Sequence, residues 1–267
     1  MKLTFLGTGA ADWDINAYEP GKEFRRFSSA IVNADLLIDP GPHIFHFAQC
    51  AGRPGMFDGV RDIIVTHTHG DHFCPATVEK LCLNGPRSTL WGDKACLRKL
   101  ERALGPEKAA QIDFRETAVN PDEPYRVGNY VIRPLRSNHA TDDRAETTRL
   151  YVIEEPETRR ILYYGCDSAW IPTESWNVIK TLPLNALVLE DTCGELATDD
   201  WRIFEHNTIE MLELMLRMFR KYGCFAPDVR YYTSHMARTL HTDHQRLKEK
   251  LAPLGVTPAY DGMTITI

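Results

Sequence analysis

The sequence predicts an α/β protein built from layered helices and sheets. Apolar runs of strand length alternate with segments whose apolar residues recur at helical spacing, from one end of the chain to the other. No linker rich in Pro, Gly or Ser divides the chain, and no repeat of fixed period occurs. With 267 residues, 43% of them hydrophobic, the chain can bury a large core. We therefore expect one domain spanning residues 1–267.

Short apolar runs bounded by Gly, Pro and Asp are expected to form strands. The strands expected in the first half of the chain are 2–7, 29–33, 36–39 and 62–67. Those expected in the second half are 130–136, 148–155, 160–167, 185–191 and the closing segment 263–267.

Helices are expected over four segments, which are 75–83, 93–104, 206–223 and 243–252. The longest, 206–223, is expected to begin with a capping box formed by Asn207 and Glu210 and to end at Gly223. The last helix begins with two residues at the same spacing, Thr242 and Gln245.

Charge and cysteine content argue against several classes of protein. The net charge of −6 and the absence of a run of Lys and Arg favour a small molecule over nucleic acid as the partner. The first residues do not resemble a signal peptide, and no apolar stretch is long enough to span a membrane, so we expect a cytoplasmic protein. The seven cysteines form no CxxC pair, and we expect them to be small buried side chains.

Metal-ligand chemistry is concentrated in the segment VTHTHGDHF at residues 65–73. Four potential ligands follow an apolar run within six positions: His67, His69, Asp71 and His72. They are therefore expected in the loop at the end of a strand, where a rigid element fixes several converging side chains. Imidazole and carboxylate donors suit zinc, manganese or iron in hydrolytic sites, whereas magnesium and calcium prefer oxygen ligands. The alternative, an ordinary polar turn, leaves this density of ligands unexplained.

The HxHxDH pattern resembles the signature of the metallo-β-lactamase superfamily, and later motifs follow in the family's order along nearly the whole chain. The resemblance implies a four-layer αββα sandwich with a metal site at one edge of the sheets. It also implies that Asp39 supports the loop of residues 67–72. Three further residues, each after a strand-like run, are implied as metal ligands: His139, Asp167 and His235.

On this resemblance the site holds two divalent metal ions, zinc by preference, with manganese or iron as alternatives. The first ion is expected on His67, His69 and His139, and the second on Asp71, His72 and His235. Asp167 is expected between the ions, beside a bridging hydroxide. Members with a redox di-iron centre carry glutamate at the position of His69, so the histidine here favours hydrolysis.

Three features resemble the phosphodiesterase branch of the superfamily, which contains ribonuclease Z and a phosphoribosyl cyclic phosphodiesterase. They are the glycine-rich turn LGTGAAD, the histidine of HNTIEMLEL, and the C-terminal pattern TSHMARTLHTDH. The branch implies Asp71 and His206 as catalytic residues, with His206 protonating the leaving oxygen. The chain lacks a cysteine before Cys50 and any insertion resembling a tRNA-binding arm, so neither named activity is itself predicted.

The expected substrate is a small or cyclic phosphodiester, for which the candidate contacts are Arg25, Arg26, Arg238 and His241. The alternative is that these are ordinary surface charges. The loops 10–27 and 192–205 carry aromatic residues that either shape a pocket or serve as packing: Trp13, Tyr18, Phe24 and Trp201. Two other functions stay open, a lactone or amide hydrolase and a non-hydrolytic metal-binding oxidoreductase. The family makes a homodimer plausible.

Overall fold

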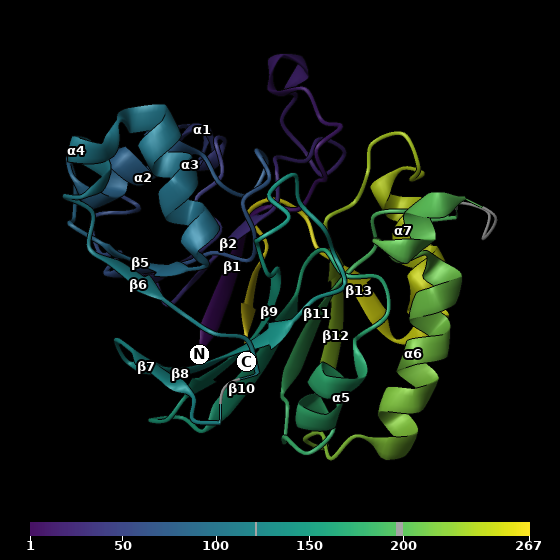
Figure 1. Ribbon diagram of the computed structural model, residues 1–267. Coiled ribbons are helices and arrows are strands. Elements are labelled where there is room, and N and C mark those ends of the chain that lie inside the picture. The colour runs from purple at the N-terminus through teal and green to yellow at the C-terminus, as the bar shows by residue number, and fades with distance from the viewer. Residues whose placement is uncertain (121, 196–199) are drawn as a thin grey trace.

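Two seven-stranded sheets pack face to face, and helices cover the outer face of each (Figure 1). The computed structural model describes residues 1–120, 122–195 and 200–267. The layers follow the order helices, sheet, sheet, helices, which confirms the expected αββα sandwich.

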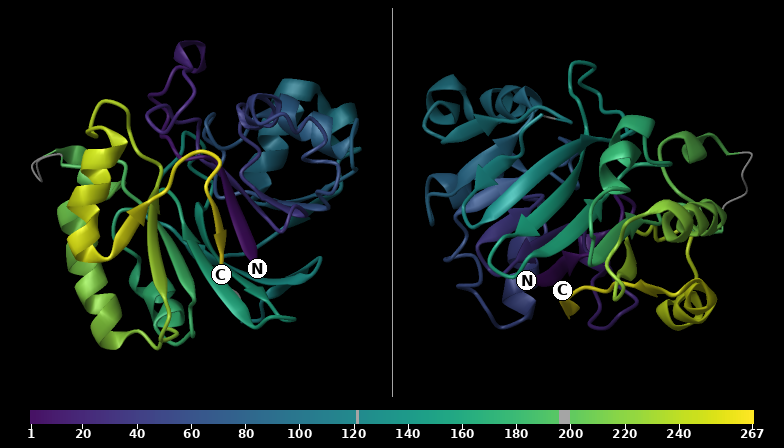
Figure 2. Two further views of the ribbon diagram at one scale, coloured as in Figure 1. Left: turned by 180° about the vertical axis from the view of Figure 1, so that it is seen from behind. Right: turned by 90° about the horizontal axis from the view of Figure 1, so that it is seen from below.

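The first sheet has the strand order β14-β1-β2-β3-β4-β5-β6. Its strands are β14 (Thr264–Thr266), β1 (Lys2–Gly7), β2 (Ser29–Val32), β3 (Leu36–Ile38), β4 (Asp62–Ile64), β5 (Thr89–Gly92) and β6 (Phe114–Glu116). The strands from β3 to β6 run parallel, so their carboxyl ends meet at one edge of the sheet. The two ends of the chain lie side by side because β14 pairs with β1 (Figure 2).

The second sheet has the order β13-β12-β11-β10-β9-β8-β7. Its strands are β13 (Val256–Pro258), β12 (Arg230–Ser234), β11 (Ala186–Glu190), β10 (Arg160–Gly165), β9 (Arg149–Glu155), β8 (Tyr130–Arg136) and β7 (Tyr125–Val127). The strands from β10 to β13 are parallel. Since β9 is antiparallel to both β8 and β10, β8 points in the same direction as the parallel set.

The helices divide between the two outer faces (Figures 1 and 2). Those over the first sheet are α1 (Ile44–Cys50), α2 (Pro75–Cys82), α3 (Lys94–Leu104) and α4 (Pro106–Ala109). Those over the second sheet are α5 (Thr173–Ile179), α6 (Ile209–Tyr222) and α7 (His244–Leu251). Three short 3₁₀ turns complete the described elements: η1 (Ile15–Ala17), η2 (Trp201–Phe204) and η3 (Ala252–Leu254).

The strands are apolar on both faces because each sheet is covered on both sides. In β10, Leu162 and Tyr164 pack between the sheets, whereas Ile161 and Tyr163 pack against the helices of the outer layer. Successive side chains of a strand point to opposite faces, so a doubly covered strand reads as a continuous apolar run. Such runs predict nine of the described strands but do not predict β5, β6, β7, β12 and β13.

Several element boundaries differ from those the sequence predicts. The strand expected over 62–67 ends at Ile64. Helix α6 begins at Ile209, and its cap is Thr208, whose hydroxyl accepts from the Met211 amide, in place of the expected Asn207. The Asn207 side chain has other partners: its Nδ2 donates to the Ser168 carbonyl, and its Oδ1 accepts from the Trp170 backbone amide.

Helix α7 is likewise capped by Asp243 in place of the expected Thr242, because the Asp243 carboxylate accepts from the Arg246 amide. Gly223 is the C-cap of α6, as expected. The expectation that all cysteines are buried is wrong for Cys50 and Cys224, which are exposed. Among the described residues, no helix has the length and apolarity needed to cross a membrane.

Candidate metal centre

The expected ligands come together where the carboxyl ends of strands from both sheets meet. His67, His69, Asp71 and His72 lie in the loop after β4, from the first sheet. The other three follow strands of the second sheet: His139 after β8, Asp167 after β10 and His235 after β12. Except for His69, each of these side chains lies on a residue that is at most 8% exposed.

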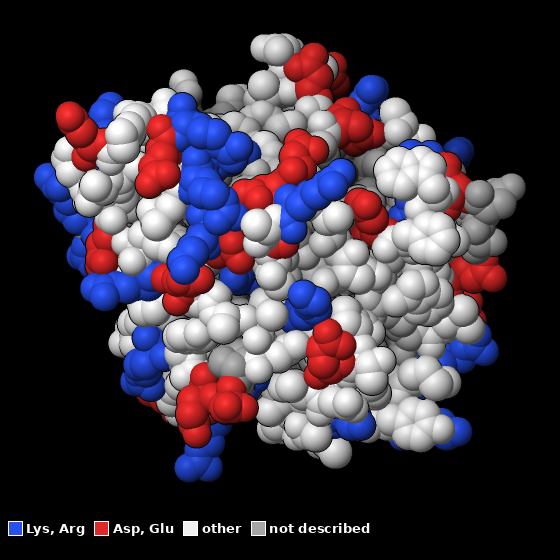
Figure 3. All heavy atoms as spheres, in the orientation of Figure 1, with Lys and Arg blue, Asp and Glu red and all other residues white. Residues whose placement is uncertain are grey.

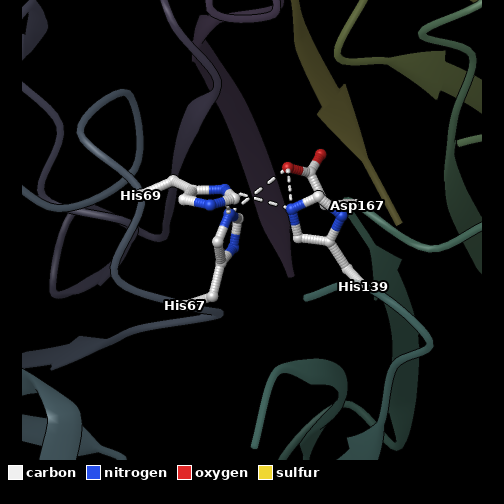
Figure 4. A group of neighbouring side chains, drawn as sticks. All are labelled: His67, His69, His139 and Asp167. Carbon is white, nitrogen blue, oxygen red and sulfur yellow. Dashed lines mark hydrogen bonds and ion pairs between the residues drawn. The ribbon is translucent and has the colours of Figure 1, made fainter. Parts of the chain in front are cut away.

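The first group of donors consists of His67, His69, His139 and Asp167 (Figure 4). The Nδ1 atom of His69 lies 3.0 Å from His67 Nε2 and 3.1 Å from His139 Nε2. Figure 4 shows the three rings converging on one point beside the Asp167 carboxylate.

The second group consists of Asp71, His72 and His235. The Nε2 atoms of the two histidines are 3.2 Å apart. Asp71 Oδ2 lies 3.3 Å from His72 Nε2 and 3.4 Å from His235 Nε2, so the three donors also face a common point.

Asp167 lies between the two groups. Its Oδ2 atom is 3.4 Å from His67 Nε2, 3.7 Å from His139 Nε2 and 3.3 Å from His72 Nε2. Burial raises the pKa of this carboxyl, but His235 and His72 together hold it well below its usual value. One ionised carboxylate therefore faces ring nitrogens of both groups.

The donor set fits metal ions better than it fits hydrogen bonding alone. Two ring nitrogens at about 3 Å can share one proton, but three converging nitrogens cannot all be satisfied in this way. Burial lowers the pKa of His67 well below its usual value and that of His139 to about 3, so both rings are neutral near pH 7. A neutral imidazole nitrogen offers the lone pair that a divalent ion takes up.

The second nitrogen of each of the four most buried ligand rings lies close to another polar group. His67 Nδ1 lies 3.1 Å from Thr66 Oγ1. His235 Nδ1 lies 2.7 Å from Thr192 Oγ1 and 2.9 Å from Asp167 Oδ1. His139 Nδ1 lies 3.5 Å from a carboxylate oxygen of Glu205. Partners of this kind fix the orientation of a ring and raise its basicity as a ligand.

Asp39 supplies that partner to His72, whose Nδ1 lies 2.9 Å from Asp39 Oδ2. The same fully buried carboxylate accepts from the Thr66 amide and the Thr66 hydroxyl, each at 2.8 Å. Asp39 thus ties the ligand loop to the end of β3, which is the support that the resemblance implies.

His206 lies against both groups of donors. Its ring is stacked on that of His235, with centroids 5.7 Å apart, and its centroid is 5.0 Å from that of His139. His206 Nδ1 is 3.6 Å from Glu190 Oε1. The remaining nitrogen, Nε2, is therefore the one available to the cleft that His206 lines.

Glu190 was not singled out in the sequence, where it reads as the polar end of an apolar strand. Its side chain is 1% exposed, and it accepts from the Asn207 amide at 2.6 Å and from the Thr192 amide at 2.8 Å. Burial alone lowers the pKa of His206, but the nearby Glu190 carboxylate raises it above its usual value.

A cleft of about 640 Å³ opens over the two groups. Its lining includes all of the expected catalytic and bridging residues, namely Asp71, His206 and Asp167. Trp201, Arg202 and Glu205 form part of its wall, and nothing in the sequence singles out the last two. The Arg202 charge is already paired, since Nη2 lies 2.9 Å from Asp200 Oδ2.

The four side chains expected to contact substrate do not line this cleft. Arg25 is buried and donates to Thr8 Oγ1 and the Ala259 carbonyl. Arg26 pairs with Asp261 at 3.2 Å. These two arginines are held by residues near the other end of the chain, which the sequence alone does not bring to them.

Arg238 and His241 are held in the same way. The Arg238 amide donates to Asp12 Oδ1 at 2.8 Å, and His241 Nε2 lies 2.5 Å from the Asp191 carbonyl oxygen. Together with Arg25 they border a separate hollow of about 180 Å³. None of the four side chains therefore lines the cleft over the metal-binding donors, and their contact with substrate stays a prediction.

The aromatic residues of the loops 10–27 and 192–205 differ in their surroundings. Phe24 contacts Trp13 and Tyr18 edge to face, with centroids 5.4 and 5.2 Å apart, so these three pack together. Trp201 is 67% exposed and lines the cleft. Residues 196–199 of the loop 192–205 lie outside the described residues.

The glycine-rich turn LGTG after β1 is explained by close packing. A Cβ atom on Gly7 would lie 2.0 Å from the Phe27 carbonyl oxygen, and one on Gly9 would lie 2.5 Å from the Trp13 ring. The turn is followed by Ala10, which lines the cleft.

A family model described as "Beta-lactamase superfamily domain" matches residues 35–236, which is more than half of the chain. The chain belongs to the metallo-β-lactamase superfamily. This superfamily fold implies divalent metal ions, and the donor groups described above lie where such ions would bind.

Other members of the superfamily resemble the chain more locally. Ribonuclease Z of Haloferax volcanii is 32% identical over 152 residues, which are 53% of this chain and 44% of that protein. Ribonuclease Z of Lachnoclostridium phytofermentans is 28% identical over 169 residues, or 60% and 52% of the two chains. The chain thus spans about half the length of these curated relatives.

Among solved structures, the short form of human tRNase Z superposes with a TM-score of 0.69 at 20% identity, over 100% of this chain and 99% of that one. At this level of identity the likeness supports the metallo-β-lactamase fold alone.

Proposed function

We propose that this superfamily member is a two-metal phosphodiesterase that hydrolyses small or cyclic phosphodiesters. The observation that carries the proposal is the pair of His206 and Glu190 in the wall of the cleft, against both groups of metal-binding donors. The two curated relatives, each named ribonuclease Z, support phosphodiester chemistry over attack on a carbonyl group.

In this proposal the first ion would be held by His67, His69 and His139, and the second by Asp71, His72 and His235. Asp167 lies between the two groups and would be available to both ions. When bound, two such ions supply an acidified water as nucleophile and stabilise negative charge that develops on the phosphoryl oxygens. Imidazole-rich donors of this kind suit zinc, with manganese and iron as alternatives.

The catalytic residues proposed are Asp71 and His206. Asp71 turns Oδ2 toward His72 and His235, and we assign its other oxygen to orienting the attacking water. His206 gives the proton on Nε2 to the departing oxygen. Glu190 keeps that proton available, because its buried negative charge favours the protonated ring.

A panel of substrates, assayed after metal analysis of the purified protein, tests the proposal. It consists of bis-p-nitrophenyl phosphate, 2′,3′-cyclic AMP, an aliphatic lactone and nitrocefin. The proposal predicts turnover of the two phosphodiesters and little of the others. Brisk lactone cleavage without phosphodiester hydrolysis would favour the carbonyl hydrolase and overturn it.

The His206→Ala variant refines this test. General acid catalysis matters most for a poor leaving group, so kcat is expected to fall about 100-fold or more for the cyclic nucleotide. For bis-p-nitrophenyl phosphate, whose leaving group needs no proton, the fall is expected to be much smaller. Equal losses on both substrates would contradict the role given to His206.

A further inference from the structure

A second groove lies beside the candidate metal centre. It has a volume of about 800 Å³, and His69 lines both this groove and the cleft over the metal centre. One wall is the surface of α3, and the other is the segment 141–145, which lies in the same loop as His139. A molecule bound at the metal centre can therefore extend into this groove past a single side chain.

The groove is lined by more positive than negative side chains. Four of its lining residues are cationic, Arg98, Lys99, Arg102 and Arg144, and two are acidic, Asp142 and Asp143. Figure 3 shows Lys and Arg gathered in a band over the region that Figure 1 labels α3. This local excess contrasts with the chain as a whole, whose net charge is −6.

Two of the four cations are already engaged. Arg98 Nε donates to Asp143 at 2.7 Å. The Lys99 ammonium donates to the Thr68 carbonyl, within the ligand loop, and lies 5.8 Å from the centroid of the Phe73 ring. These contacts join α3 to both loops of the metal centre and make the groove a defined part of the site.

The other two cations, Arg102 and Arg144, are exposed on opposite walls. Among the residues that the structure describes, neither has a carboxylate within ion-pair distance; Arg102 Nε donates only to the Arg98 carbonyl. A guanidinium group binds phosphate through a planar fork of N–H donors, and its charge persists at all relevant pH values. Two such groups facing one groove suit a phosphate.

We propose that this groove binds a phosphate group of the substrate other than the one that is hydrolysed. The inference rests on the proposed phosphodiesterase function and narrows it to substrates that carry at least two phosphates. The second phosphate is either a terminal monoester or the next diester of a nucleotide chain. Both present the same anionic oxygens to Arg102 and Arg144.

The test compares dinucleotides that share one scissile bond. ApA has a single phosphate, while pApA and ApAp add a terminal phosphate on one side or the other. The proposal predicts that at least one of the two has a KM about tenfold below that of ApA, a difference that shrinks as salt is added. The trinucleotide ApApA, whose second phosphate is internal, identifies which source the groove prefers.

Reversing the charges of Arg102 and Arg144 tests whether these two side chains cause the lower KM. In the double variant Arg102→Glu/Arg144→Glu, the ratio of the KM for ApA to that for the favoured phosphorylated dinucleotide is expected to fall to about one. Arg217→Glu on α6 is the matched control, because Arg217 is also exposed and has no carboxylate of a described residue within ion-pair distance. The control is expected to keep the tenfold ratio. Thermal unfolding checks that both variants are folded.

Two results would overturn the inference: KM values for pApA and ApAp no lower than that for ApA, or a ratio that survives the charge reversal. Failure of the phosphodiesterase proposal is visible separately, as an absence of bis-p-nitrophenyl phosphate hydrolysis. In that case the binding of phosphorothioate-linked pApA, measured by calorimetry on the metal-loaded protein and on both variants, decides the inference without turnover. Equal affinity in wild type and double variant would then overturn it.

Discussion

At the scale of single residues, the proposed site includes a buried carboxylate, that of Glu190, beside His206 in the wall of the cleft. Glu190 has no access to solvent, and its two oxygens accept from the backbone amides of Asn207 and Thr192. Hydrogen bonds of this kind hold a buried carboxylate in one orientation. The fixed negative charge then acts on the ring of His206, 3.6 Å away.

Replacing Glu190 with Gln tests this arrangement. The variant loses the charge that raises the pKa of His206, so the ring loses its proton at lower pH. Because the proposed role requires the protonated ring, the alkaline limb of the profile of kcat against pH is expected to move to lower pH. At pH 8 we expect kcat on 2′,3′-cyclic AMP to fall about 10- to 100-fold. An unchanged profile would show that Glu190 does not act through His206.

The sequence singles out side chains that the structure brings together, but it does not single out their neighbours. His67, His69, Asp71 and His72 are recognisable because they are dense in one short segment. Glu190 has no such local context, although it ends an apolar strand and Asp167 closely follows one, and this placement is a usable signal. Arg25 and Arg26 are candidate substrate contacts because a guanidinium group suits phosphate. Their partners Ala259 and Asp261 are more than 200 residues away in sequence, so the sequence does not reveal them.

At the scale of elements, the candidate site residues follow the ends of strands, and three of them have positive φ angles. Asp39, Asp167 and His235 follow β3, β10 and β12 and have φ angles of 59°, 54° and 57°. A residue other than glycine rarely adopts this left-handed conformation, which costs about 1 kcal/mol. The turn after each strand thus directs a functional side chain toward the centre at some cost in stability.

The pair His235→Ala and His235→Gly measures that cost. Both variants lose the same imidazole, but only glycine adopts a positive φ angle without strain. In the metal-free protein we expect the glycine variant to be about 1 kcal/mol more stable than the alanine variant, as measured by urea unfolding. The reverse order would mean that the backbone at position 235 is not strained.

Helix α3 carries a cluster of basic residues that the overall composition does not reveal. Its basic residues Lys94, Arg98 and Arg102 recur every four positions and therefore share one face. A search for consecutive Lys and Arg misses this spacing, and Arg144 joins them from a loop 42 positions beyond Arg102. The net charge of −6 argued against an anionic partner because a charge summed over the whole chain hides a local cluster of cations.

At the scale of the whole molecule, the candidate centre joins the two halves of the sandwich. His67, His69, Asp71 and His72 belong to the first sheet, whereas His139, Asp167 and His235 belong to the second. Ions held by both sets would bind the folded chain and not the unfolded one, and so would add directly to its stability. A homodimer, which the family resemblance suggested, stays a prediction.

Removal of metal is therefore expected to destabilise the fold. Saturation at 100 times the dissociation constant stabilises by about 2.7 kcal/mol per ion. For the loss of two ions from a chain of this size we expect a chelator such as EDTA to lower Tm by about 10–20 °C, as measured by differential scanning calorimetry, and added zinc to restore it. The Asp167→Asn variant, which lacks the shared carboxylate, should respond much less. A Tm that is insensitive to EDTA would contradict a centre that spans both sheets.

The most direct test of the central claim is a titration of the metal-free protein with zinc, or with manganese, while hydrolysis of bis-p-nitrophenyl phosphate is recorded. The account predicts no activity without metal and full activity at two ions per chain, with Asp167→Asn inactive at the same loading. Full activity in the metal-free protein, or an end point at one ion per chain, would contradict it.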